Sequence, residues 1–192
     1  TAAAIAYGLY EKQKNTKFLV FDLGGGTFDV SVLELFENIL EVRAVAGDNY
    51  LGGEDFTELL VQHYMDRMNL KSAELTQKTL GQIRKQAEAC KRSYSQAACG
   101  IMNCRIDGEE KKLEISLKEY ERMCEPLLTK IRRPVQRSLS DAHVKLSDID
   151  EIVLVGGATR LPVIRDFIIR MFKKFPDTAM DPDEAVALGA AV

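Results

Sequence analysis

The sequence predicts an α/β fold. The segment Phe18–Leu33 holds two short β-branched and aromatic runs on either side of three consecutive glycines, a pattern typical of two strands in a hairpin. From Phe56 onward the apolar residues recur at helical spacing. Near the end, the run Glu151–Gly157, which is apolar after Glu151, is followed by a further helical pattern. Strands that alternate with amphipathic helices indicate a sheet covered by helices.

The predicted strands continue beyond the hairpin. Ile39–Ala46 supplies a third strand, so residues 18–46 form an antiparallel meander that ends in a turn-rich break at Gly47–Asp55. Two further strands, Cys99–Ile106 and Leu113–Leu117, flank a polar turn and pair with each other.

Four helices accompany these strands. They are predicted from Phe56 to Met68, from Leu75 to Tyr94, from Lys118 to Ala142, and after Leu161 with Pro162 in the first turn. We expect a break in the third helix at Pro126 and a kink or break at Pro134, because each proline removes a backbone donor. A last helix opens with Asp181 as N-cap, Pro182 at the first position and Glu184 in a capping box.

This order predicts a nested organisation. The meander and the Ile152–Val155 strand belong to one discontinuous subdomain, residues 1–51 and 126–192, and residues 52–125 form an inserted subdomain of helices and a small sheet. Thr1–Tyr7 and Ala187–Val192 have the pattern of helices without caps, so we expect the chain to be part of a longer protein.

Composition excludes several functional classes. The 192 residues are 46% apolar with a net charge of −3, which gives no basic field for nucleic acid. No signal peptide and no apolar span of membrane length is present. The four cysteines form no C-x-x-C pair and the two histidines are far apart, which argues against zinc and for reduced thiols. We therefore expect a cytoplasmic protein without nucleic-acid or membrane partners.

The glycine-rich hairpin is the first candidate site. Gly24, Gly25 and Gly26 permit backbone N–H groups to converge on a phosphate, while the adjacent side chains of Asp22, Thr27 and Asp29 supply groups for a metal shell or a water. The alternative is an ordinary tight hairpin turn. Neither the P-loop nor the dinucleotide fingerprint fits, because a strand and not a helix follows the glycines.

Two further sets complete what one nucleotide needs. The spacing of Glu88, Lys91, Arg92 and Ser95 places them on one helical stripe, which could hold a ribose and stack on a purine. The alternative is a solvated face with a Glu88–Arg92 pair worth about 0.3–0.5 kcal/mol. The third set lies after the Ile152–Val155 strand, where glycines allow close approach and Arg160 offers a planar surface for a base; alternatively these glycines only turn the chain into a helix. Its residues are Gly156, Gly157, Ala158, Thr159 and Arg160, with Asp183 downstream.

Four motifs in register carry a family resemblance. DLGGGTFDVSVLE, AGDNYLGGEDF, LVGGATRLP and DPDEAVALGAA resemble the second half of the nucleotide-binding domain of the 70-kDa heat-shock chaperones, the DnaK-like family. The resemblance runs from Thr1 to Val192, with Gln96–Lys112 unlike common members. The short insertion is similar to the bacterial HscC-type branch.

The resemblance implies a ribonuclease-H-like lobe of an actin-like ATPase, with ATP or ADP and Mg²⁺ as ligands. It implies that Gly25, Gly26 and Thr27 contact the β- and γ-phosphates, and that Asp22 positions the magnesium shell, through water, or the attacking water, with Asp29 nearby. The nucleotide-binding residues that it implies are Gly24, Gly25, Gly26, Thr27, Gly53, Glu88, Lys91, Arg92, Ser95, Gly156, Gly157, Arg160 and Asp183. Ala158 stands where many members have serine, so a hydroxyl contact with the base is lost, at a cost of about 1 kcal/mol.

The family's function is implied in the same way. Slow ATP hydrolysis switches a peptide-binding domain between open and closed states in a stress-response chaperone, whose partners are unfolded peptide clients, a J-domain co-chaperone and a nucleotide exchange factor. The family's first lobe carries a second phosphate loop and an essential lysine that are not in this chain, so we expect negligible hydrolysis and weak binding. Sugar or acetate kinases and actin-like filament proteins share the fold class and are the alternatives.

Overall fold

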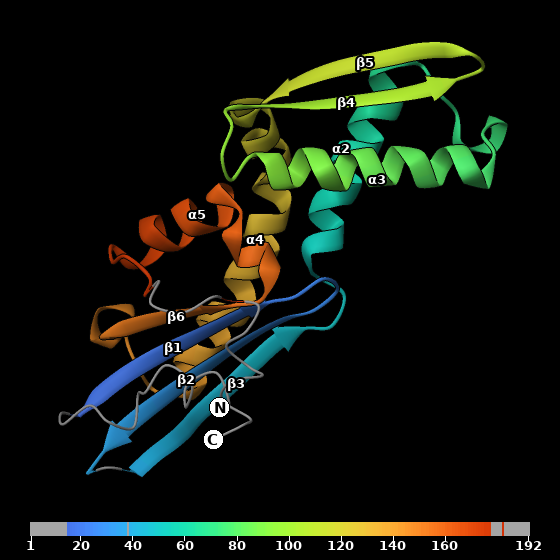
Figure 1. Cartoon of the computed structure of the whole chain (residues 1–192). Coiled ribbons are helices and arrows are strands. Elements are labelled where there is room, and N and C mark those ends of the chain that lie inside the picture. The colour runs from blue at the N-terminus through green and yellow to red at the C-terminus, as the bar shows by residue number, and fades with distance from the viewer. Residues whose placement is uncertain (1–14, 38, 178–181, 183–192) are drawn as a thin grey trace. The chain divides into compact units, whose positions relative to one another are not determined.

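The computed structural model describes residues 15–37, 39–177 and 182, and these divide into two units. The first unit contains the described residues up to 53, residues 128–160 and those from 164 onward; the second contains residues 54–127 and 161–163. Figure 1 labels the helices and strands of both. The α/β class predicted from the sequence is confirmed, and the assignment of ribonuclease-H-like and inserted subdomains stays a prediction.

A four-stranded sheet forms the first unit, in the order β3-β2-β1-β6 (Figure 1). β1, β2 and β3 form the predicted antiparallel meander, and β6 lies parallel to β1 on its other side. The bounds of these strands are β1 Thr16–Leu23, β2 Phe28–Phe36, β3 Ile39–Asp48 and β6 Glu151–Val155. The parallel pairing aligns Asp22 with Val155, so the end of β6 reaches the end of β1 that precedes the glycines.

Burial on both faces explains the composition of β1 and β6. Leu19, Phe21, Ile152 and Leu154 are buried, as are the residues that alternate with them, because strands inside an α/β sheet are covered on both faces. One face carries the cluster Phe18, Val20, Leu33, Leu35, Val153 and Val155, against which Leu40 packs. At the hairpin end the rings of Phe21 and Phe28 lie 4.7 Å apart, a pair worth about 0.5–1.5 kcal/mol beyond its burial.

The second unit is built from α2, α3 and a two-stranded sheet, and Figure 1 shows β4 and β5 beside α3. The elements are α2 Gly53–Arg67, α3 Gln77–Ser93, β4 Cys99–Ile106 and β5 Glu109–Ser116. Thr76 caps α3 by accepting the N–H of Thr79. The predicted apolar edge of α3 is confirmed, since Ile83, Ala87, Cys90 and Tyr94 are buried and Leu80 is partly so.

Three tyrosines tie the second unit together through their hydroxyl groups. Tyr94 donates to the carbonyl of Ile115 at 3.1 Å, Tyr120 donates to that of Phe56 at 3.1 Å, and Tyr64 donates to that of Lys111 at 2.6 Å. The rings of Tyr94 and Tyr120 stack at 4.8 Å. Burial above all raises the pKa of each of these phenols, so all three remain neutral donors.

The predicted break at Pro126 is wrong, and so is a break at Pro134, whereas the alternative of a kink at Pro134 stays a prediction. α4 runs without a break from Leu117 to Asp141, although an interior proline costs a helix about 3 kcal/mol. Buried residues recur on both sides of each proline: Tyr120, Cys124, Leu127, Ile131, Val135 and Leu139. Burial of this continuous apolar stripe outweighs the local penalty, which is the usual way in which tertiary packing overrides propensity.

After β6 the chain turns through a short 3-10 segment, Gly157–Arg160, into α5 Pro162–Phe172, as predicted. The predicted helices at Thr1–Tyr7 and after Asp181 lie outside the described residues, apart from Pro182. Within residues 15–37 and 39–177, no helix combines the length and apolarity that crossing a membrane requires.

Candidate functional site

The glycine-rich loop joins β1 to β2 at the end of the meander. Leu23 and Phe28 form the last strand pair, and the N–H of Gly24 donates to the carbonyl of Thr27 at 3.0 Å. Gly25, Gly26 and Thr27 are exposed. No atom lies within 4 Å of a Cβ built on Gly25 or Gly26, so the outer side of this backbone is open to a ligand.

A second backbone segment braces the loop from the other side. The N–H of Gly53 donates to the carbonyl of Gly24 at 2.8 Å. A Cβ on Gly52 would lie 2.5 Å from the nitrogen of Gly26, closer than side-chain carbons approach backbone, so only glycine fits there. The sequence reasoning named Gly53 and missed Gly52, although the Leu-Gly-Gly-Glu-Asp motif was a signal for both.

Two carboxylates lie at the base of the loop. Asp22 on β1 is directly opposite Asp29 on β2, and side chains opposite each other in an antiparallel pair share one face. Burial, and then the negative charge of Asp29, raise the pKa of Asp22. No salt bridge joins either carboxylate to a residue in the described part of the chain. The pair therefore favours a cation nearby.

These carboxylates fit Mg²⁺ better than a metal held by protein alone. Residues 15–37 and 39–177 contain no group of three or more His, Cys, Asp or Glu placed to hold a metal ion. Mg²⁺ usually keeps several waters and takes one or two carboxylates together with substrate phosphates. Asp22 and Asp29 beside an open phosphate-type loop match that pattern.

The third predicted set lies against Asp22. Gly156 follows β6 with φ +84°, and a Cβ there would approach Oδ1 of Asp22 to 3.0 Å. The N–H and hydroxyl of Thr159 both donate to the carbonyl of Gly156, at 3.1 and 2.7 Å, and the N–H of Gly156 donates to that of Pro182 at 3.0 Å. Gly157 and Arg160 are exposed. Asp183 lies outside the described residues.

The helical stripe belongs to the second unit, and Glu88 is its centre. Glu88 accepts from Thr57 at 2.6 Å, from Lys91 at 2.7 Å and from Arg92 at 2.9 Å. Burial alone would raise the pKa of Glu88, but these three hydrogen bonds lower it to about 2. Lys91 is 7% exposed, whereas Arg92 is exposed.

This geometry refines two expectations. The Glu88–Arg92 pair of the alternative interpretation is present. Ser95 lies beyond the end of α3 at Ser93, where its hydroxyl donates to the carbonyl of Arg92 at 2.9 Å. The role of Thr57 was missed; its position at the start of α2 was the only signal in the sequence.

The first unit thus brings together Asp22, the loop Gly24–Thr27, Asp29, Gly53 and the Gly156–Arg160 segment. In the second unit, Glu88, Lys91 and Arg92 are joined by ion pairs and Ser95 follows them. Backbone donors beside paired carboxylates can bind a phosphate with its counter-ion.

Comparisons with known proteins agree with this chemistry. A sequence model of the family described as Hsp70 protein matches residues 1–192. The whole chain aligns with 39% of the length of a heat shock 70 kDa protein from Penicillium citrinum, with 42% identity over 198 residues. It also aligns with 31% of the length of one from Emericella nidulans, with 43% identity over 198 residues. It aligns with 34% of the length of a chaperone protein DnaK from Thermosipho melanesiensis, with 40% identity over 207 residues.

The chain therefore spans about a third of the length of these relatives. The predicted similarity to the HscC-type branch stays a prediction. The mixed sheet and helices agree with the actin-like ATPase fold of the family. With a family match over all 192 residues and relatives at 40% identity or more, the chain belongs to the Hsp70 family.

Proposed function

We propose that the chain is an ATP-binding lobe of a molecular chaperone that couples ATP hydrolysis to the binding and release of unfolded polypeptide. The observation that carries this proposal is the open Gly25–Gly26 backbone, braced by Gly52 and placed beside the carboxylates of Asp22 and Asp29. A tight hairpin needs neither the brace nor a pair of carboxylates on one face.

The loop would hold the β- and γ-phosphates. Successive N–H groups in a turn form a concave site for anions, and glycine at positions 25 and 26 keeps side-chain carbons out of it. The hydroxyl of Thr27, which is exposed at the end of the loop, adds a further donor. These groups would bind and orient the phosphates as hydrogen-bond donors, and they would not transfer protons or form covalent bonds.

Asp22 would hold the magnesium shell through water, with Asp29 nearby. Mg²⁺, when bound, neutralises charge that develops on the phosphates. Burial and then the charge of Asp29 raise the pKa of Asp22, and a cation bound here would relieve the repulsion between the two carboxylates. With Mg²⁺ bound, Asp22 in its ionised form would be able to accept a hydrogen bond from the water that attacks the γ-phosphate.

The adenosine contacts that we propose are those that the family resemblance implies. In the second unit, Glu88 fixes the orientation of Lys91 and Arg92 through its ion pairs, and these groups with Ser95 suit ribose hydroxyls. In the first unit, the exposed guanidinium of Arg160 offers a planar surface for a purine, and Gly156 and Gly157 allow close approach. Asp183 completes the proposed set.

The remaining properties follow from the family. We propose unfolded peptide, a J-domain co-chaperone and a nucleotide exchange factor as partners, and a cytoplasmic location. Because the chain spans about a third of its relatives, we propose that hydrolysis needs residues from the rest of such a protein, and that the chain turns over ATP negligibly.

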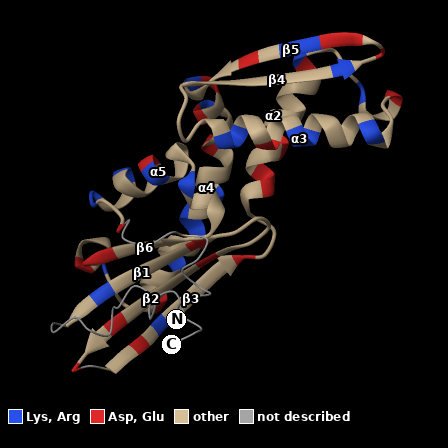
Figure 2. Ribbon diagram, in the orientation of Figure 1, with Lys and Arg blue, Asp and Glu red and all other residues tan. Residues whose placement is uncertain are grey.

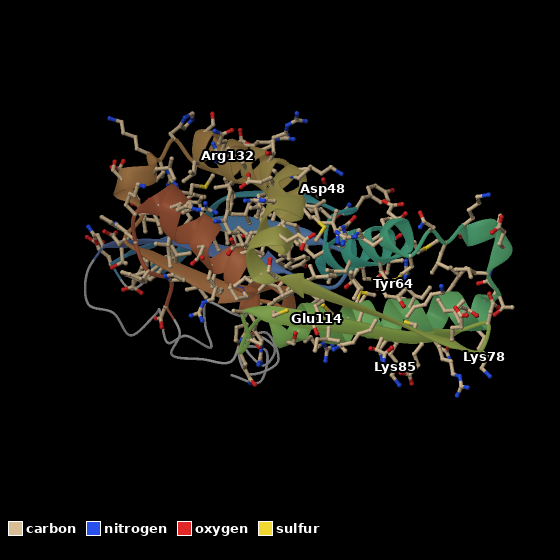
Figure 3. The ribbon with its side chains drawn as sticks, turned by 90° about the horizontal axis from the view of Figure 1, so that it is seen from above. Asp48, Tyr64, Lys78, Lys85, Glu114 and Arg132 are labelled. Atoms are coloured by element: carbon tan, nitrogen blue, oxygen red, sulfur yellow. The ribbon has the colours of Figure 1, made fainter. Side chains whose placement is uncertain are left out.

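The test compares two lysines of α3. Lys91→Met removes the buried ammonium of the stripe, whereas Lys85→Met removes an exposed one, labelled in Figure 3, from the same helix. Isothermal titration of ADP with Mg²⁺ into the 192-residue chain should show at least about fivefold weaker binding for Lys91→Met and no change for Lys85→Met. Equal affinities in all three proteins, with unchanged circular dichroism spectra, would contradict the proposed site.

A further inference from the structure

A pocket whose lining includes none of the residues proposed for the nucleotide site lies between the end of β3 and α4 within the first unit. It has a volume of about 500 Å³, which lies in the range of small-molecule sites. Its lining consists of Gly47, Asp48, Tyr50, Lys130, Arg133, Pro134 and Arg137. Figure 3 shows Asp48 beside α4.

The charge of this lining is the opposite of that of the whole chain. Three of its side chains, Lys130, Arg133 and Arg137, are cationic and Asp48 is the single acid, although the net charge of the protein is −3. The cations are spaced i, i+3 and i+7 along α4, so they share one face over about 10 Å of helix. Figure 2 shows basic residues along the part of α4 near the sheet.

Few partners within the described residues neutralise these cations. No salt bridge joins Lys130 or Arg133 to a residue of the described ranges. Nε of Arg137 lies 3.5 Å from Asp141 in an exposed pair, which is worth little in water. Like charges three and four residues apart repel each other on a helix, so an anion bound here removes a cost that the free chain carries.

The other side of the pocket offers an aromatic surface. Tyr50 is 90% exposed. Its backbone N–H donates to Oδ1 of Asp48 at 2.9 Å, so the only acid of the lining accepts a hydrogen bond from a neighbouring residue. Arg132 on the same helix is directed elsewhere, since its guanidinium carbon lies 5.9 Å from the ring centre of Phe167. The lining of the pocket therefore includes Lys130, Arg133 and Arg137 of α4 but not Arg132.

We infer that this pocket binds a small organic polyanion, a molecule with at least two carboxylate or phosphate groups spaced along the Lys130–Arg137 face. A guanidinium binds such groups with two parallel hydrogen bonds, and the ring of Tyr50 covers a planar or apolar portion of the ligand. The inference does not depend on the proposed nucleotide site.

The test follows the backbone amide resonances of the isotopically labelled 192-residue chain by NMR during titration with citrate and, separately, with inorganic pyrophosphate, both without Mg²⁺. We expect saturable shifts at residues 48–50 and 130–137 with at least one of them. Citrate alone would identify carboxylates as the preferred groups, and pyrophosphate alone would identify phosphates. Shifts at Gly25 and Gly26 would report separately on the proposed nucleotide site.

Two arginine variants control for net charge. Arg133→Gln should weaken the shifts at residues 48–50 by about tenfold in affinity, whereas Arg170→Gln, an exposed arginine of α5 outside the lining, should leave them unchanged. The inference is overturned if neither anion binds saturably, if shifts spread evenly over the basic surface, or if Arg133→Gln binds as tightly as the wild type.

Discussion

Gly156 lies directly against the carboxylate of Asp22. A Cβ atom on Gly156 would approach Oδ1 of Asp22 to 3.0 Å and the carbonyl of Leu23 still more closely. The backbone there has φ +84°, in the region that favours glycine. The exit from β6 and the acid of β1 are therefore fixed to each other, and a side chain at position 156 would have to displace the carboxylate proposed to hold Mg²⁺.

Gly156→Ala should lower the free energy of unfolding by about 1–3 kcal/mol, because it adds both a strained φ and a steric clash. Gly81→Ala is the matched control. Gly81 lies in α3 with no atom within 4 Å of its built Cβ, so alanine there should stabilise the chain by about 0.5–1 kcal/mol. Urea unfolding of both variants measures the difference, and equal effects would contradict the assigned contact.

Asp22→Asn should raise stability at neutral pH and weaken nucleotide binding. Because the pKa of Asp22 is raised in the folded chain, its ionised form disfavours folding, and stability falls as the pH rises through that pKa. Asparagine removes this loss, so the free energy of unfolding should increase above the titration and change less with pH. Binding of ADP with Mg²⁺ should fall by about tenfold.

Asp166→Asn, an exposed acid on α5, provides the comparison for Asp22→Asn. It removes the same charge from an exposed helix surface and should leave the affinity for ADP unchanged. Urea unfolding at several pH values and isothermal titration give the two measurements. A loss of stability at neutral pH in Asp22→Asn would show that its carboxylate is not strained by burial.

Glu88→Gln should reduce stability above the titration of Glu88 and have little effect below it. The folded-state pKa of Glu88 is lowered to about 2, so the contribution of its carboxylate is complete above the unfolded value of about 4.3 and is lost as the pH falls toward 2. Because the side chain is 36% exposed, solvent screens its ion pairs, and we expect only about 1 kcal/mol.

The pH dependence of urea unfolding checks this prediction. The wild-type chain and Glu88→Gln should converge as the medium is acidified below the unfolded pKa. Glu114→Gln is a suitable control, since Glu114 on β5 pairs with Lys112 and both side chains are exposed, where such a pair contributes little. A constant difference between wild type and Glu88→Gln at every pH would point to packing and not to charge.

Pro126→Ala should stabilise the chain by about 1–2 kcal/mol. Pro126 is exposed in the interior of α4, where alanine restores a backbone donor and removes a clash, partly offset by the greater entropy of the unfolded chain. Pro134→Ala should gain less, because Pro134 is buried and its replacement also loses packing. Thermal unfolding ranks the two, and a destabilised Pro126→Ala would mean that α4 depends on the proline geometry.

The sequence was sufficient where local chemistry and tertiary packing agree. The β-branched runs around the glycines became β1 and β2, and the period of Ile83, Ala87 and Cys90 became the buried edge of α3. It was insufficient for α4, since the cost of Pro126 is local whereas the burial that outweighs it involves residues far away in sequence.

In the candidate site, too, the features that are local in sequence could be predicted and the long-range contacts could not. Glycines and acids of the hairpin are adjacent in sequence, so Asp22, Gly25 and Asp29 could be selected from spacing alone. The brace from Gly52 and the hydrogen bond from Thr57 to Glu88 join segments separated by tens of residues. Only the folded chain reveals such pairs, because no local pattern encodes which distant backbone will approach.

The binding of phosphates by the glycine-rich loop is tested most directly by NMR of the isotopically labelled chain with ADP and Mg²⁺, and with adenosine in parallel. The amide resonances of Gly25 and Gly26 should shift saturably with ADP and Mg²⁺ and remain unchanged with adenosine, which lacks phosphates. Unchanged resonances at saturating ADP, or equal shifts with adenosine, would contradict a phosphate site at this loop.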